Sequence, residues 1–204
     1  MTDHRSKVTT VDPFVIVERP EDPRTDPLRL EYTVHPAPDS EGGVDLPHAR
    51  WVADLADRHV NPRWDERFEV VDGALRVGID GTETTLTEGE DVVIPATVPH
   101  RHWNPTPEPA RVRYEARPGL RAAEALETLY TLAQAGRTDE EGVPNPLQFA
   151  VIQDAYPGYF YSTDQPRILQ RAMVATLAPI GRLLGYEATY TRDEMGPLRR
   201  SSTR

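Results

Sequence analysis

The chain has 204 residues, of which 38% are hydrophobic, so it is long enough for one packed domain with an additional segment. Acidic residues outnumber basic ones by 33 to 23, and the net charge of -10 argues against nucleic acid and anionic membranes as partners, because both favour a concentrated positive surface. The sequence contains no cysteine, which excludes disulfides, thiolate ligands and a cysteine nucleophile, and it has no apolar run long enough to span a membrane.

Short strands separated by turns are expected over most of the first 118 residues. Alternating or continuous apolar runs mark the strands, at 14–17, 28–34, 51–60, 67–71, 75–79, 84–86, 92–94 and 111–117. Asp72-Gly73 and Asp80-Gly81 are typical of tight hairpins between such strands. This spacing of strands and turns predicts a sandwich or a barrel.

The periodicity changes to that of helices after residue 118. Apolar residues recur at helical spacing over 126–133, and a second helix is expected to begin at Pro146. A third helix is expected over about 166–184, with Thr163 or Asp164 as its N-cap.

The expected organisation is therefore mainly β, with helices at the C-terminal side. We predict a β-barrel over residues 12–118 and an α-helical extension over 119–186 that packs on the barrel. Residues 1–11 and 187–204 are predicted to be tails.

Two sequence motifs lie in the strand-rich part of the chain. In the first, six residues separate Glu66 from Gly73, and His59-Val60-Asn61 lies just upstream. In the second, the pattern G-x5-P-x-G-x2-H-x3-N runs from Gly89 to Asn104, with Thr97 in place of the second glycine. The two motifs resemble those of the cupin superfamily, in which a histidine stands at the position of Asn61. The resemblance implies a jelly-roll β-barrel of the RmlC-like type and a homodimer.

The resemblance also implies that His59, Glu66 and His100 are three of the family's four metal ligands. The alternation of side chains along a strand is consistent with this, because residues i and i+2 point to the same side of a sheet. Asn61 then lies on the side of His59, and His102 lies on the side of His100. Imidazole and carboxylate groups that converge inside a barrel suit a divalent transition metal such as Fe, Mn, Ni, Zn or Cu.

The fourth ligand is left open, because the amide of Asn61 is a weaker donor to such a metal than imidazole. In one interpretation, three protein ligands hold the metal and Asn61 lies at the edge of the site. In a second, His102 supplies the missing imidazole. In a third, the metal has been lost and the barrel binds a small ligand without it.

The function predicted from these residues is that of a metal-dependent cytoplasmic enzyme acting on a small organic molecule, above all by oxidation or dioxygenation. Glu66 is the candidate catalytic residue, as a ligand that also transfers a proton. Two alternatives are a non-catalytic cupin that binds a small ligand without metal and a cupin isomerase or epimerase. The sequence contains no phosphate-binding, dinucleotide-binding or serine-hydrolase motif.

Overall fold

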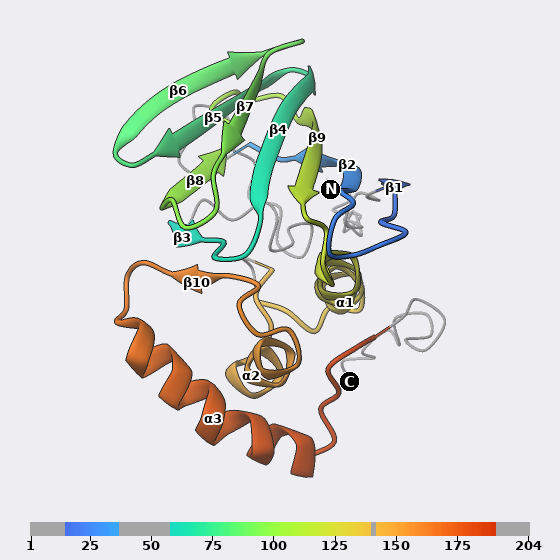
Figure 1. Cartoon of the computed structure of the whole chain (residues 1–204), viewed down its shortest axis with the longest axis vertical. Coiled ribbons are helices and arrows are strands. Elements are labelled where there is room, and N and C mark those ends of the chain that lie inside the picture. The colour runs from blue at the N-terminus through green and yellow to red at the C-terminus, as the bar shows by residue number, and fades with distance from the viewer. Residues whose placement is uncertain (1–14, 37–57, 140–141, 191–204) are drawn as a thin grey trace, which may run out of the picture.

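The structure is a computed structural model that describes residues 15–36, 58–139 and 142–190 (Figure 1). Within these residues the chain forms ten strands and three helices. The strands are β1 (Val15–Glu18), β2 (Leu28–Val34), β3 (His59–Val60), β4 (Asp65–Asp72), β5 (Ala74–Ile79), β6 (Thr82–Thr87), β7 (Asp91–Ile94), β8 (His100–Trp103), β9 (Ala110–Arg117) and β10 (Tyr161–Ser162). The helices are α1 (Ala122–Gln134), α2 (Pro146–Ala155) and α3 (Arg167–Leu183).

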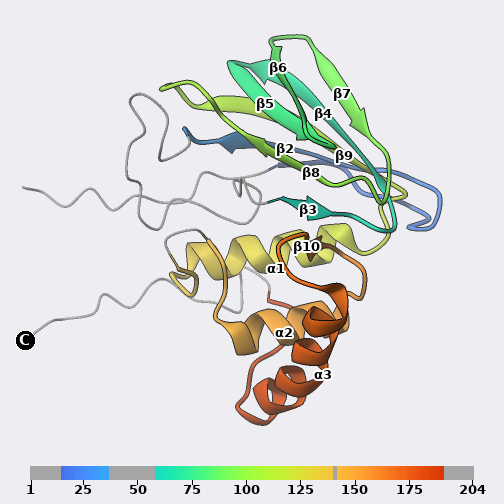
Figure 2. The same cartoon turned by 90° about the vertical axis from the view of Figure 1, so that its left-hand side faces the viewer.

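The strands form two antiparallel five-stranded sheets, in the orders β1-β2-β9-β4-β7 and β10-β3-β8-β5-β6. The two sheets face each other (Figure 2) and enclose one hydrophobic core, to which both contribute. The predicted fold class is confirmed, because the chain is mainly β and jelly-roll-like with helices after it. The sheets form an open sandwich, however, and do not close into the barrel that was predicted.

Side chains alternate between the two faces of a strand, so every second side chain of the longest strands enters the core. In β2 and β9 every second residue is buried, as in a strand with one face against a core. β4 follows the same pattern, so that Glu66, Phe68 and Val70 all point between the sheets. Glu66 is thus the polar member of an otherwise apolar inward row, which is an expensive placement unless its charge is compensated.

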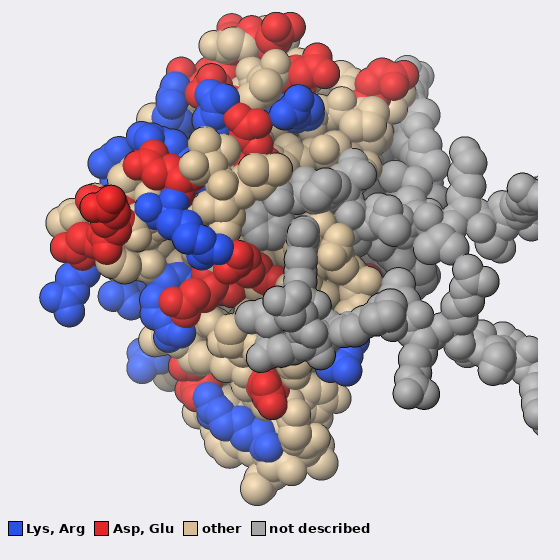
Figure 3. All heavy atoms as spheres, turned by 90° about the vertical axis from the view of Figure 1, so that its right-hand side faces the viewer, with Lys and Arg blue, Asp and Glu red and all other residues tan. Residues whose placement is uncertain are grey.

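The opposite face of the β2-β9-β4 sheet is covered by ion pairs. Arg113 contacts Glu31 at 2.7 Å and Glu69 at 3.1 Å, and Arg29 contacts Glu115 at 2.6 Å. On the side of the molecule drawn in Figure 3, acidic and basic side chains lie next to one another. Such a face stays hydrated, and each exposed pair adds little stability. The predicted homodimer remains a prediction.

The two Asp-Gly pairs differ in what they connect. Asp80 and Gly81 both have positive φ, 46° and 84°, and they join the paired strands β5 and β6 in the hairpin that was predicted. Asp72-Gly73 does not form a hairpin, because β4 and β5 belong to different sheets. Gly73 has a φ of 83°, and a Cβ there would lie 3.1 Å from Cα of Ala110. The chain therefore turns a corner between the sheets at a position where a side chain would be strained and crowded.

The helices form successive layers beyond the sheets (Figure 2). Leu126 and Tyr130 of α1 belong to the same core cluster as the sheets, whereas Leu129 of α1 packs with Ile152 of α2. α3 packs on α2 through Ala178 and Gly181. The N-cap of α3 is Pro166, without a side-chain hydrogen bond, so the predicted caps Thr163 and Asp164 are wrong. None of the described helices has the length and hydropathy needed to cross a membrane.

Two segments differ from what the sequence pattern indicates. Strand β10 was not predicted; its Tyr161 and Ser162 pair with Val60 and His59 of β3, a contact made by chain segments far apart in sequence. Only residues 59–60 of the strand predicted at 51–60 are described as strand, and 51–57 lie outside the described residues, as do predicted tail residues 1–11 and 191–204. Tyr190, within the other predicted tail, is buried against α1 and α2.

Candidate metal centre

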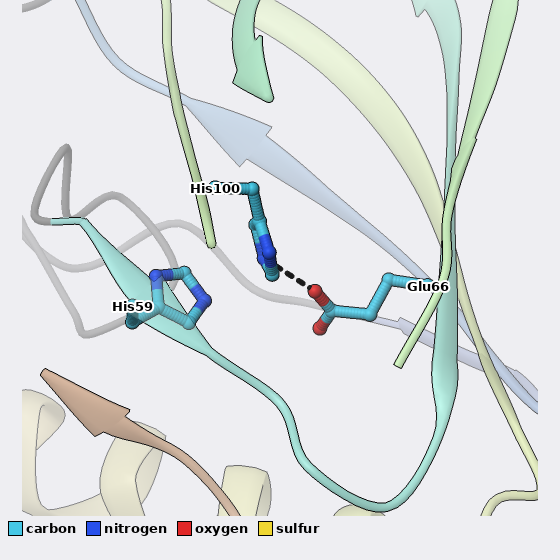
Figure 4. Close-up of side chains that lie close together, drawn as sticks. All are labelled: His59, Glu66 and His100. Atoms are coloured by element: carbon cyan, nitrogen blue, oxygen red, sulfur yellow. Dashed lines mark ion pairs between the residues drawn. The ribbon is translucent and has the colours of Figure 1, made fainter. Parts of the chain in front are cut away.

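Three of the five predicted ligand residues meet between the sheets (Figure 4). One potential ligand atom from each of His59, Glu66 and His100 lies within 4.8 Å of the other two. Glu66 comes from β4 in one sheet, and the two histidines come from β3 and β8 in the other. Glu66 and His100 are 4% and 1% exposed, whereas His59 is half-buried and forms the open side of the cluster.

The register of the second sheet brings the two histidines together. His59 of β3 lies directly opposite His100 of β8, and their ring centroids are 4.4 Å apart. Residues that are directly opposite in an antiparallel pair project to the same face, so both imidazoles point toward the first sheet. Glu66 projects from that sheet toward them (Figure 4).

The carboxylate of Glu66 is held by one of its oxygens. Oε1 accepts hydrogen bonds from the Tyr114 hydroxyl at 2.6 Å, from Nδ2 of Asn61 at 3.0 Å and, more weakly, from Nε1 of Trp64 at 3.4 Å. The other oxygen, Oε2, lies 2.6 Å from Nε2 of His100. Outer groups of this kind orient a carboxylate ligand and leave one oxygen available to an ion.

The orientation of the His100 ring is fixed by a contact of Nδ1, the ring nitrogen that does not face Glu66. Nδ1 lies 2.9 Å from the carbonyl oxygen of Val98, which can only accept, so Nδ1 carries a proton. In the neutral imidazole the lone pair of Nε2 then faces Oε2 of Glu66. These two atoms are close but not aligned as a hydrogen bond, and both are buried. Two electron-rich atoms held this close require a cation between or on them, either a proton on His100 or a metal ion.

The electrostatics keep Glu66 ionised. Burial by itself raises the pKa of Glu66, but the neighbouring imidazoles of His100 and His59 and the Tyr114 hydroxyl outweigh it and lower this pKa to about 2. Burial likewise lowers the pKa of His100, yet Glu66 more than compensates and raises it. The cluster therefore presents a carboxylate anion and two imidazoles, which is a donor set suited to a first-row transition metal.

The other two predicted ligands lie outside this cluster. The amide nitrogen of Asn61 donates to Glu66, so Asn61 lies beside the site and orients the carboxylate. His102 also points inward but packs on Phe68, with ring centroids 4.6 Å apart, and it is not a member of the group formed by His59, Glu66 and His100. The assignment of individual residues as metal ligands remains a prediction.

Sequence reasoning missed three aromatic residues at the site, Trp64, Tyr159 and Phe160. Trp64 holds Glu66 together with Tyr114. Tyr159 and Phe160 come from the helical extension: Tyr159 lies 5.2 Å from Trp64, and Phe160 lies 5.9 Å from His59, between ring centroids. Nothing in the local sequence around Tyr159 signals that it lies near Glu66.

The chain therefore combines a jelly-roll-like sandwich with imidazole and carboxylate groups that converge between its sheets and could hold a metal ion. Residues 52–114 match the family model of the cupin domain, so this segment belongs to the cupin superfamily. Among curated proteins, none matches this chain.

The similarity to solved structures extends over about half of this chain. An uncharacterised protein with a double-stranded β-helix domain from Klebsiella pneumoniae is 18% identical, with a TM-score of 0.39, over 53% of this chain and 78% of its own. A protein with a cupin-2 domain from Shewanella frigidimarina is 19% identical, with a TM-score of 0.36, over 52% and 79%. KdgF from a Halomonas species is 18% identical, with a TM-score of 0.37, over 51% and 76%.

Proposed function

We propose that the chain is a metal-dependent enzyme that oxidises a small organic molecule with O2. In this proposal His59, Glu66 and His100 hold one divalent transition metal between the sheets. The observation that carries it is the buried contact of 2.6 Å between Oε2 of Glu66 and Nε2 of His100, two atoms whose opposite sides are already held by protein groups. Both atoms are buried without a hydrogen-bond partner and, with His59, belong to the group that could hold one cation.

The residues of the chain have separable tasks in this proposal. When bound, a metal on two imidazoles and one carboxylate supplies a Lewis acid and a redox centre with coordination positions left for O2 and substrate. Glu66 contributes negative charge through Oε2, and Tyr114, Asn61 and Trp64 keep it oriented. Because its pKa is lowered to about 2, Glu66 is a weak base at neutral pH, which favours its role as a ligand over proton transfer.

Metal reconstitution tests the proposal directly. Chelator-treated protein is offered Fe(II) without oxygen, and separately Mn(II), Ni(II), Cu(II) and Zn(II), and the bound metal is measured by elemental analysis after desalting. We expect about one equivalent of at least one of these metals per chain, as for a single mononuclear site. At a free metal concentration about 100 times the dissociation constant, the folded state should gain about 2.7 kcal/mol, seen as a higher melting temperature.

The opposite outcome favours the second candidate function. Because Glu66 and His100 can also satisfy each other as an ion pair, the fold could bind a small ligand without metal. Binding of less than about 0.1 equivalent of every metal by well-folded protein would contradict the enzyme proposal and support this metal-free binding protein.

Removal of one hydroxyl should weaken metal binding without removing a ligand. In the Tyr114→Phe variant, Glu66 loses its shortest hydrogen bond, and we expect a loss of metal affinity of about 10-fold, as for other groups that orient a ligand. The matched control is Tyr156→Phe, which removes a buried tyrosine's hydroxyl bonded to Thr189, away from the cluster. Equal metal affinities for the two variants would show that the Tyr114 hydroxyl does not orient the site.

A further inference from the structure

The segment between α2 and α3 reaches the open side of the cluster. It runs through Tyr159, Phe160 and β10, which adds to the edge of the second sheet beside β3 (Figure 1). We propose that Tyr159 and Phe160 form the wall that contacts the substrate, and that the substrate is a small planar unsaturated ring with an oxygen acceptor. This inference rests on the proposed function, since it concerns the same site.

Backbone contacts fix this segment in place. Tyr161 and Ser162 pair with β3, and the amide of Thr163 donates to the carbonyl oxygen of Arg58 at 3.1 Å. On the other side, the amide of Tyr159 donates to the carbonyl oxygen of Tyr156 at 3.1 Å, at the end of α2. The two aromatic residues are therefore held between a helix end and a paired strand, and we expect them to keep their position when a ligand binds.

Phe160 is braced as a flat surface next to a candidate ligand. Its ring lies 5.9 Å from His59, nearly perpendicular at 77°. Phe149 of α2 supports it at 5.7 Å and Tyr159 at 5.4 Å. Phe160 nevertheless stays half-buried, as does His59. A rigid aromatic ring partly open to solvent beside polar groups is typical of a small-molecule site, and it favours planar ligands that can stack or meet it edge to face.

Tyr159 adds a hydrogen-bond donor to this wall. Its ring packs on Trp64, whose indole nitrogen reaches Glu66, so the phenol lies in the immediate surroundings of the carboxylate. Burial, and then the negative charge of Glu66, raise the pKa of Tyr159, which keeps its proton on the hydroxyl. Among the described residues no group exchanges a hydrogen bond with this hydroxyl, in contrast to that of Tyr114. A ligand oxygen can therefore serve as the acceptor for this hydroxyl.

Two probes that differ only in the ring test the inference. Benzoate and cyclohexanecarboxylate carry the same carboxylate on a planar and a puckered ring, and their affinities for zinc-loaded protein are measured by calorimetry. Zn(II) is used because it has no redox chemistry. We expect benzoate to bind about 5-fold more tightly, in line with the worth of one aromatic contact.

Variants test whether the preference for benzoate comes from Phe160 and whether Tyr159 donates a hydrogen bond to both probes. Phe160→Leu should remove the preference for benzoate, and Phe160→Tyr should restore it. Tyr159→Phe should weaken both probes by about 3- to 10-fold, because both lose the same hydrogen bond. The control is Tyr161→Phe, whose ring lies under Arg167 at 4.6 Å, and we expect it to bind both probes as the unmodified protein does.

The outcomes separate the two proposals. Protein that holds zinc but binds the two probes equally, with no effect of Phe160→Leu, overturns the aromatic wall and leaves the metal centre standing. Protein that holds no zinc contradicts the metal proposal. The same titrations on that metal-free protein still test whether Phe160 contacts the ligand. A preference for benzoate that depends on Phe160 supports the aromatic wall, and equal binding of the two probes overturns it. Zinc content and circular dichroism of every variant exclude unfolding as the cause.

Discussion

Replacing His100 with glutamine is expected to remove metal binding, whereas the same replacement at His102 should leave it intact. Both histidines lie on the inward face of β8, two residues apart, and both are buried. Only His100 has its Nε2 within 2.6 Å of Glu66, while His102 packs on Phe68. The pair therefore offers a matched comparison in which strand, burial and substitution are the same and only membership of the cluster differs.

We expect His100→Gln to weaken metal binding by more than about 100-fold, since the loss of a ligand exceeds the 10- to 100-fold effect of groups that merely orient ligands. Glutamine is close to histidine in size, and its amide can still donate to Glu66, so the fold should be kept. Metal affinities come from competition with a chromophoric chelator, and circular dichroism checks the fold. If His102→Gln abolishes binding and His100→Gln does not, the ligand is His102, and the cluster drawn in Figure 4 is not the metal site.

Replacing Phe68 with alanine should cost more stability than any surface change near the site. Phe68 is 1% exposed and lies in the core with its ring centroid 4.6 Å from His102 and 5.3 Å from Tyr114. Removal of a buried phenyl ring loses its transfer free energy and leaves a cavity, and we expect the free energy of unfolding to fall by about 3 to 5 kcal/mol. The cavity would also lie beside the Tyr114 ring, whose hydroxyl holds Glu66.

Urea unfolding followed by circular dichroism measures this loss in chelator-treated protein. The control is Val93→Ala on the neighbouring strand β7, where the side chain is 54% exposed, and we expect a change within about 0.5 kcal/mol. A loss of less than about 1 kcal/mol for Phe68→Ala would mean that the two sheets do not pack around this ring as described.

The spacing of apolar residues and the turn residues predicted most of the strands and helices. The alternation in 28–34 and 111–117 predicts strands, and β2 and β9 pair over this whole length with their apolar residues inward. The apolar spacing over 126–133 predicts a helix, which α1 contains. These signals are local, because burial of one face imposes period 2 on a strand and period 3.6 on a helix. What they do not contain is the identity of the partner strand, and Asp72-Gly73 was read as a hairpin for that reason.

By itself, the sequence predicted the fold class, and the resemblance of its two motifs to those of cupins implied that His59, Glu66 and His100 belong to one site, where the structure brings them together. Only the tertiary structure decided what surrounds them. It separated His102 from the cluster, turned Asn61 toward Glu66, and brought Phe160 from the helical extension to His59. These contacts depend on strand register and on packing between segments that are distant in sequence, and both are determined by the free energy of the whole core. They therefore produce no periodic pattern in the local sequence.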